Sequence, residues 1–273
     1  MLKQRIITAL ILAPLIIWGI FALSEMAFNL ALAAVIALAA WEWARLAGIQ
    51  NIVQRIAYSL IIVLLIYGIG SVLHLTYIKE FLFSAVLLWW FWVVIHLFSY
   101  RQRELPAEVH KLSAVLAGIP VLIGTYFALS LLRNDPAYGP AYIMMLMLLV
   151  WGADTAAYFS GRRFGKNKLL FSVSPGKSWE GVWGALIASL VLAILGAIYF
   201  EKFDTHLPAF ILVSLLAVIF SIIGDLNESY FKRRAGVKDS GTILPGHGGI
   251  LDRIDSLTAA APVFYSGLVL SGV

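Results

Sequence analysis

Four acidic residues in the carboxy-terminal part of the chain have a spacing suited to binding a divalent cation. Asp225 and Glu228 are three residues apart, and so are Asp252 and Asp255. Residues at this spacing share one face of a helix, so up to four carboxylates converge if the two helices pack together. Mg²⁺ binds oxygen ligands, typically one or two carboxylates together with substrate phosphates. The pattern therefore indicates a Mg²⁺ site that binds phosphates.

Each of these acids also has an interpretation without a metal. Asp252 and Asp255 would stabilise the first turn of a helix through its dipole. Asp225 could form a buried ion pair with a nearby Lys or Arg, and Glu228 is spaced for an i,i+4 pair with Lys232. The spacing alone leaves these alternatives open.

Two glycine-containing segments accompany the acids. Pro245–Gly249 precedes a helix that we expect to begin near Ile250, where backbone amides could bind a phosphate. Ser174–Ser178 is predicted to be a turn that offers hydroxyls and an ammonium group; neither segment is a Walker motif. The surrounding loops, Ser160–Gly181 and Asn227–Ser256, together hold ten Lys and Arg residues. These bases suit a polyphosphate ligand, although anchoring at the membrane surface is an alternative role for Lys232, Arg233 and Arg234.

The composition indicates an integral membrane protein. Of the 273 residues, 61% are hydrophobic and 13% are charged, and the mean hydropathy is +0.90. A soluble globule could not bury that much apolar surface, which excludes an ordinary soluble enzyme as well as a disordered or fibrous chain. The absence of cysteine excludes disulfides, thiolate metal sites and cysteine nucleophiles. The net charge of +5 fits membrane anchoring better than nucleic-acid binding.

Hydrophobic segments of about 20 residues predict an all-α polytopic protein with about nine transmembrane helices. Asp154 lies inside one of them, and an acid at membrane depth is by default a functional candidate, with a polar contact between helices as the alternative. The predicted spans are Ile6–Leu23, Ala27–Trp43, Ile56–Leu73, Phe81–Phe98, Leu112–Leu132, Ala141–Phe159, Val182–Phe200, Pro208–Gly224 and Leu257–Ser271.

The distribution of positive charge predicts the orientation. With the amino terminus in the cytoplasm, 17 of the 20 Lys and Arg residues fall on the cytoplasmic side, as the positive-inside rule requires. The two long charged loops then lie on that side, where we expect the active site. The polar stretch Tyr100–Lys111 divides the chain into amino-terminal helices, residues 1–110, and a catalytic part, residues 111–273.

The second loop contains Ser229, Lys232-Arg233, Lys238-Asp239, His247-Gly248-Gly249 and Asp252-Arg253-Ile254-Asp255. These residues resemble the signature of the phosphatidate cytidylyltransferase (CDP-diacylglycerol synthase) family of bacterial type. The first loop also resembles the family, in Asp154, Ala157-Tyr158, Gly161-Arg162, Gly165-Lys166 and Ser174 to Lys177. The resemblance covers Trp151 to the end of the chain, whereas the first five spans match only in being hydrophobic.

The resemblance implies an enzyme of phospholipid biosynthesis in the cell (inner) membrane. It would condense CTP with phosphatidic acid, using Mg²⁺ and, in some members, K⁺. The implied metal ligands are Asp225, Asp252 and Asp255. The residues expected to be catalytic are Asp225, Asp252, Lys232, Lys238 and Arg253. The residues expected to bind substrate are Ser174, Lys177, Ser178, Ser229, Arg233, Asp239, His247, Gly248 and Gly249. A turn-stabilising role is the alternative for His247. We expect lipid and nucleotide as partners, no nucleic acid, and a homodimer through the apolar helices.

Three other functions compete with this hypothesis. A secondary transporter would also hold acids within the membrane, but at the midplane rather than beside charged loops on one side. A CTP-dependent lipid kinase would attack the γ-phosphorus with an alcohol and release CDP. A purely structural membrane protein would not require so many charges in glycine-containing loops.

Overall fold

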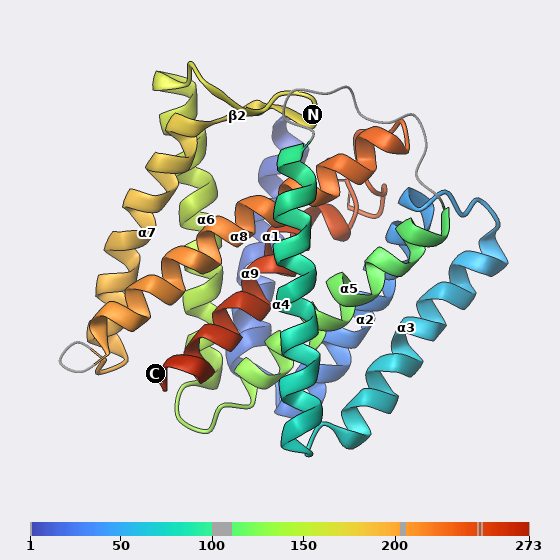
Figure 1. The fold of residues 1–273 in the computed structure, drawn as a ribbon, viewed down its shortest axis with the longest axis horizontal. Coiled ribbons are helices and arrows are strands. Elements are labelled where there is room, and N and C mark those ends of the chain that lie inside the picture. Colours follow the sequence, from blue (N-terminus) through green and yellow to red (C-terminus); the bar gives the residue numbers. More distant parts are fainter. Residues whose placement is uncertain (1, 100–110, 203–205, 245, 247, 273) are drawn as a thin grey trace.

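The computed structural model describes residues 2–272 apart from 100–110, 203–205, 245 and 247. Within these ranges the chain forms nine α-helices and one small hairpin (Figure 1), so the predicted all-α fold is confirmed. The helices are α1 (Leu2–Ala22), α2 (Glu25–Leu46), α3 (Ile52–Val72), α4 (Thr76–Ser99), α5 (Lys111–Arg133), α6 (Gly139–Phe164), α7 (Trp179–Tyr199), α8 (Leu207–Arg234) and α9 (Leu251–Ser271). The hairpin strands are β1 (Lys168–Leu170) and β2 (Ser174–Ser178).

Each predicted span corresponds to one of these helices. Eight of them, α2 to α9, are long and apolar enough to cross a membrane, and the apolar part found in α1, Leu10–Ala22, is shorter. The protein is therefore a multi-pass membrane protein. The last helix begins at Leu251, which confirms the start expected near Ile250 and lies ahead of the predicted span Leu257–Ser271. This earlier start places Asp252 and Asp255 on the helix itself, in its first turns.

Local sequence signals fix several helix ends. The side chain of Ser24 accepts a hydrogen bond from the Ala27 amide at the start of α2, and Asn51 accepts from the Val53 and Gln54 amides at the start of α3. These are preferred N-cap residues, because their side chains satisfy amides that the helix leaves free. At the other end of the chain, α9 stops at Gly272, whose φ of 64° a glycine adopts without strain.

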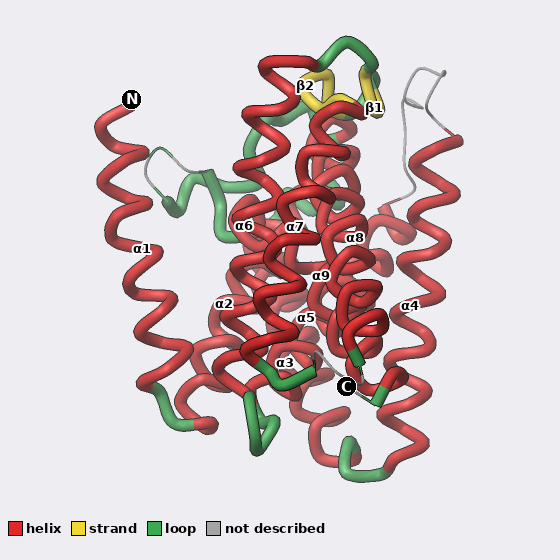
Figure 2. Tube along the Cα trace, turned by 90° about the vertical axis from the view of Figure 1, so that its left-hand side faces the viewer, coloured by secondary structure: helices red, strands yellow, loops and turns green. Residues whose placement is uncertain are grey.

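Helices α5, α8 and α9 form the interior of the bundle. Helix α8 packs along α9, α6 packs along α7, and α5 packs against both α2 and α9. In Figure 2 the first helix, α1, stands at the edge of the bundle, and its main neighbour is α6. Helices α2, α3 and α4 all pack against this interior, and in α2 the Trp43 indole donates a 2.9 Å hydrogen bond to the Ala114 carbonyl of α5.

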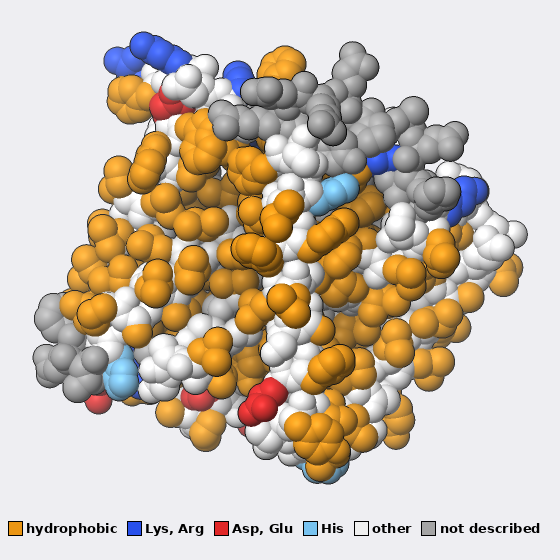
Figure 3. Space-filling view, in the orientation of Figure 1, with side chains coloured by type: hydrophobic (Ala, Val, Ile, Leu, Met, Phe, Trp, Pro, Cys, Tyr) orange, Lys and Arg blue, Asp and Glu red, His pale blue; other side chains and the backbone are white. Residues whose placement is uncertain are grey.

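Charge and apolar surface separate along the molecule. Hydrophobic side chains cover the middle of the face in Figure 3, whereas most of the visible Lys and Arg side chains gather at its upper end. The hairpin lies at this same end (Figure 1). This polarity suits a protein that spans a membrane, although the predicted cytoplasmic orientation remains a prediction. The predicted domain boundary falls within residues 100–110, outside the described residues.

Candidate active site

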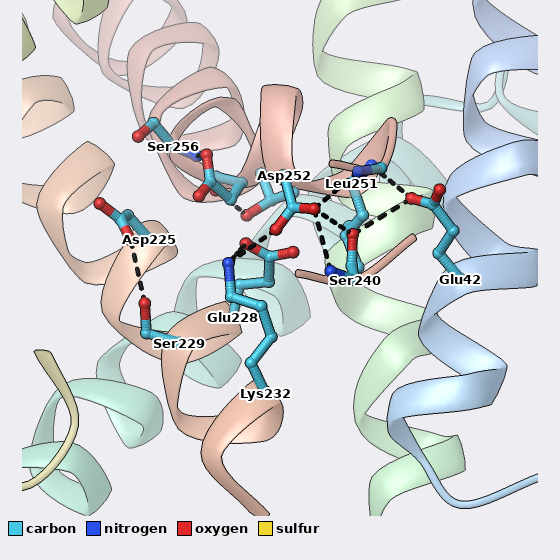
Figure 4. A network of polar contacts seen from close by, with 12 residues as sticks. Glu42, Asp225, Glu228, Ser229, Lys232, Ser240, Leu251, Asp252 and Ser256 are labelled. Carbon is cyan, nitrogen blue, oxygen red and sulfur yellow. Dashed lines mark hydrogen bonds and ion pairs between the residues drawn. The ribbon is translucent and has the colours of Figure 1, made fainter. Parts of the chain in front are cut away.

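A lysine bridges two carboxylates where α8 and α9 meet (Figure 4). The Lys232 ammonium lies 2.8 Å from Glu228 Oε2 and 2.8 Å from Asp252 Oδ1. All three side chains are largely buried, with 12%, 3% and 5% exposed respectively. The predicted convergence of the acids of two packed helices is thus confirmed, and so is the alternative i,i+4 pair between Glu228 and Lys232.

The second oxygen of Asp252 is held by the loop that precedes α9. Asp252 Oδ2 accepts hydrogen bonds from the Ser240 amide (2.9 Å), the Ser240 hydroxyl (2.9 Å) and the Gly249 amide (2.7 Å). A Cβ on Gly248, whose φ is +80°, would lie 2.5 Å from the same oxygen. Ser240, Gly248 and Gly249 therefore enclose the Asp252 carboxylate, and these contacts fix it in place.

A second ion pair lies beside a cavity. The Lys177 ammonium of β2 is 2.6 Å from Asp225 Oδ2 of α8, and the Ser229 hydroxyl donates to Asp225 Oδ1 at 3.2 Å. Lys177 and Asp225 line a cavity of about 240 Å³ together with Asp154 and Tyr158 of α6 and Ser178. The alternative of an ion pair for Asp225 is therefore confirmed, and the pair faces a space that a ligand group could enter.

The segment predicted to be a turn, Ser174–Ser178, is strand β2 instead. It pairs antiparallel with β1, and Lys168 lies opposite Ser178. The hairpin ends directly at α7, where the Ser178 hydroxyl accepts a hydrogen bond from the Gly181 amide at 3.2 Å. The residue types of one short segment do not reveal that it pairs with another strand. In the hairpin, Lys177 faces the cavity and Ser178 caps the helix.

The other predicted site residues lie around these two ion pairs. The Arg233 guanidinium donates through Nε to the Val173 carbonyl at 3.3 Å, which ties the end of α8 to the hairpin. Ser174 is half-buried, whereas Lys238, Asp239 and Arg253 are exposed. His247 lies outside the described residues. The roles of these residues in substrate binding and catalysis stay predictions.

Two residues that the sequence analysis did not select join the network. The Ser240 hydroxyl lies within hydrogen-bonding distance of Glu42 of α2. Both residues also contact the first turn of α9 (Figure 4). Glu42 lies in the predicted span Ala27–Trp43, so the rule that singled out Asp154 as an acid in an apolar segment would also have found Glu42. Ser240 carried no comparable signal, because a serine in a polar loop is ordinary.

The carboxylates suit a hard cation in their chemistry. One oxygen of Asp225 and one of Asp252 each pair with a lysine ammonium. Each ammonium places a single positive charge where a divalent cation could bind instead. Asp255 lies close enough to Asp225 and Glu228 to interact with both. Among the described residues, however, no three Asp, Glu, His or Cys side chains form a group that could hold a metal by themselves. A bound Mg²⁺ would therefore complete its shell with water and ligand phosphates, as this ion usually does.

Comparisons with known proteins agree with the resemblance of the loops and extend it to the whole chain. The profile of the Cytidylyltransferase family matches residues 3–271. A protein named phosphatidate cytidylyltransferase from Pseudomonas aeruginosa is 44% identical over 272 residues, covering 100% of this chain and 98% of the relative. One of the same name from Haemophilus influenzae is 40% identical, covering 97% of each chain, and one from Staphylococcus haemolyticus is 37% identical, covering 96% and 97%. Since the match spans nearly every residue, the chain belongs to the cytidylyltransferase family.

Proposed function

We propose that this protein condenses CTP with phosphatidic acid to form CDP-diacylglycerol and pyrophosphate. The observation that carries the proposal is the cavity with the Lys177–Asp225 pair, placed beside apolar helices. A lipid phosphate can reach such a place while its acyl chains stay in the bilayer, and a nucleotide can reach it from the aqueous side. The full-length relatives named phosphatidate cytidylyltransferase support the same reaction.

The nucleophile in this reaction is the substrate itself. A phosphate monoester has a second pKa of about 6, so phosphatidic acid is largely a dianion at neutral pH. One of its oxygens attacks the α-phosphorus of CTP and forms a new P–O bond. The bond from the α-phosphorus to the oxygen that bridges to the β-phosphorus breaks, and pyrophosphate leaves with that electron pair. No protein nucleophile and no strong base is needed.

The task of the protein is to bring two anions together. Lys177 binds a phosphate oxygen at the cavity, which it can do when Asp225 exchanges the ammonium for another cation. Lys232 keeps its ion pair with Glu228 when another cation binds Asp252, and it supplies a second positive charge near the helix junction. Charges positioned in advance in this way stabilise a transition state more than mobile solvent does.

Mg²⁺ is part of the proposal, with Asp225 and Asp252 as its main ligands and Asp255 beside them. When bound, the ion supplies positive charge that neutralises the phosphates of the nucleotide and the leaving pyrophosphate. Each of these carboxylates already pairs with a positive charge, the ammonium of a lysine, and this supports the assignment. Purified protein in EDTA should lose its activity and recover it when Mg²⁺ is added in excess.

The location and assembly follow from the same reasoning. We infer an inner-membrane enzyme whose active site faces the cytoplasm, because the basic loops and the hairpin belong to the end predicted to lie there. We also expect a homodimer through exposed apolar helix faces. Light scattering on the detergent-solubilised protein measures the number of chains. Labelling of a cysteine introduced into the hairpin, from either side of the membrane, measures the orientation.

Product analysis tests the reaction against its rivals. Detergent-purified protein receives phosphatidic acid and CTP labelled either at the α- or at the γ-phosphorus. The proposal requires the α label in the lipid and the γ label in pyrophosphate. A lipid kinase acting on an alcohol would instead place the γ label in the lipid and release CDP. Neither product, combined with solute flux in liposomes, would point to a transporter.

A further inference from the structure

Glu42 of α2 is a buried acid in the amino-terminal half of the chain, which the proposed reaction does not use. Only 1% of the surface of Glu42 is exposed, and the helix around it is largely apolar. Burying a carboxylate is costly unless hydrogen bonds compensate for the lost water. The partners of Glu42 therefore show what retains it.

Those partners belong to the active-site segment far along the chain. Glu42 Oε2 accepts a 2.8 Å hydrogen bond from the Leu251 amide, 209 residues away, and lies 3.2 Å from the Ser240 hydroxyl, 198 residues away. The Leu251 amide is the first of α9, and no side-chain cap bond is made by the preceding Ile250. Glu42 thus acts as the cap of α9 from another helix, where a negative charge is also favoured by the helix dipole.

Two glycines make room for this carboxylate. A Cβ built on Gly241 would collide with Glu42 Oε1, and one built on Gly249 would collide with Glu42 Oε2 and with the Ser240 hydroxyl. From the sequence, Gly249 is expected to let the backbone approach a substrate. In the structure, the space that its missing side chain leaves is filled by Glu42.

The same loop atoms hold the catalytic carboxylate. The Ser240 hydroxyl, which contacts Glu42, also donates to Asp252 Oδ2, and the Gly249 amide donates to that oxygen as well. Asp252 in turn binds Lys232. A continuous chain of contacts therefore runs from α2 to the ion pair at the helix junction, as Figure 4 shows.

We propose that Glu42 is a positioning residue of the reaction: it holds Ser240, Gly249 and the first turn of α9 so that Asp252 and Lys232 keep their places at the junction of α8 and α9. This inference rests on the proposed function and adds to it a task for the amino-terminal helices. Glu42 touches no reacting atom and acts through Ser240 and Leu251.

The test compares Glu42→Ala and Glu42→Gln in the full-length protein. The amide of Glu42→Gln keeps an acceptor for Leu251, whereas Glu42→Ala keeps none. We expect kcat per folded molecule to fall about 100-fold in Glu42→Ala, the effect of misplacing a catalytic group by about 1 Å, and about tenfold in Glu42→Gln. The KM for phosphatidic acid should change by less than about threefold, because Glu42 does not contact this substrate.

Two matched variants separate positioning from loss of stability. Glu25→Gln changes an exposed acid in the first turn of the same helix and should leave kcat unchanged. Trp43→Phe removes the indole hydrogen bond to Ala114 and should lower the unfolding temperature while kcat per folded molecule stays within twofold.

Three outcomes have distinct meanings. An active wild-type protein whose kcat is unchanged in Glu42→Ala would overturn the inference and leave the proposed function intact. The same holds if Trp43→Phe lowers kcat as much as Glu42→Ala, because instability alone would then explain the loss. A wild-type protein that forms no CDP-diacylglycerol would instead overturn the proposed function.

Discussion

The two halves of the molecule bury their membrane helices to different extents. In α2, α3 and α4, between 17% and 28% of the residues of each apolar segment are buried, against 33% to 67% in α5 to α9. The carboxy-terminal helices are therefore more tightly packed and hold most of the charged site residues, whereas α2, α3 and α4 expose more of their surface. Helices of similar hydropathy thus have two different roles. Glu42 connects them, because it lies on α2 and contacts the loop and the first turn of α9 at the site.

Removing the Lys177 ammonium should cause a large loss of activity. Lys177→Met removes the ammonium that pairs with Asp225 and borders the cavity. We expect kcat/KM to fall by about 10²–10³, the usual loss when a preorganised charge is removed from a transition state. Lys168→Met, which removes an exposed lysine from the other strand of the hairpin, is the control. Equal activity in both variants would move phosphate binding away from the cavity.

Lys232→Met should reduce both activity and stability. Removing one partner of a buried ion pair typically costs about 3–5 kcal/mol, because the remaining charges lose their compensation. Thermal unfolding in detergent measures the loss. The double variant Lys232→Met with Glu228→Gln should be less destabilised than the sum of the single variants, since it also removes one of the stranded charges. Additive effects would show that the bridge contributes little.

Two glycine substitutions, one in each half of the chain, should have the smallest effects on stability. Gly249→Ala places a methyl group against Glu42 and Ser240, and such overpacking costs about 1–3 kcal/mol. Gly68→Ala in α3 meets nothing within 4 Å, so it should be neutral or add up to about 1 kcal/mol through helix propensity. Unfolding temperatures of the two variants measure the difference. A similar loss in both would mean that the space at Gly249 is not filled as described.

Much of the fold could be predicted from the sequence, because spans in a bilayer are specified by long apolar segments. The convergence of Asp225, Glu228 and Asp252 followed from helix periodicity alone. The hairpin at Ser174–Ser178 did not, because strand pairing depends on a partner that lies outside the segment. Glu42 could have been singled out as an acid in an apolar span, but its partners could not, since they are about 200 residues away.

In the proposed mechanism, the reaction takes place at the cavity beside Asp225. The most direct measurement compares pyrophosphate release by purified wild-type, Asp225→Asn and Asp135→Asn proteins with CTP, phosphatidic acid and Mg²⁺. Asp135 lies in the loop between α5 and α6, where it binds backbone amides, and serves as the matched control. We predict that Asp225→Asn loses activity at least about 10³-fold while it elutes and unfolds like the wild-type protein, and that Asp135→Asn remains active. Near-normal turnover by folded Asp225→Asn would contradict the account.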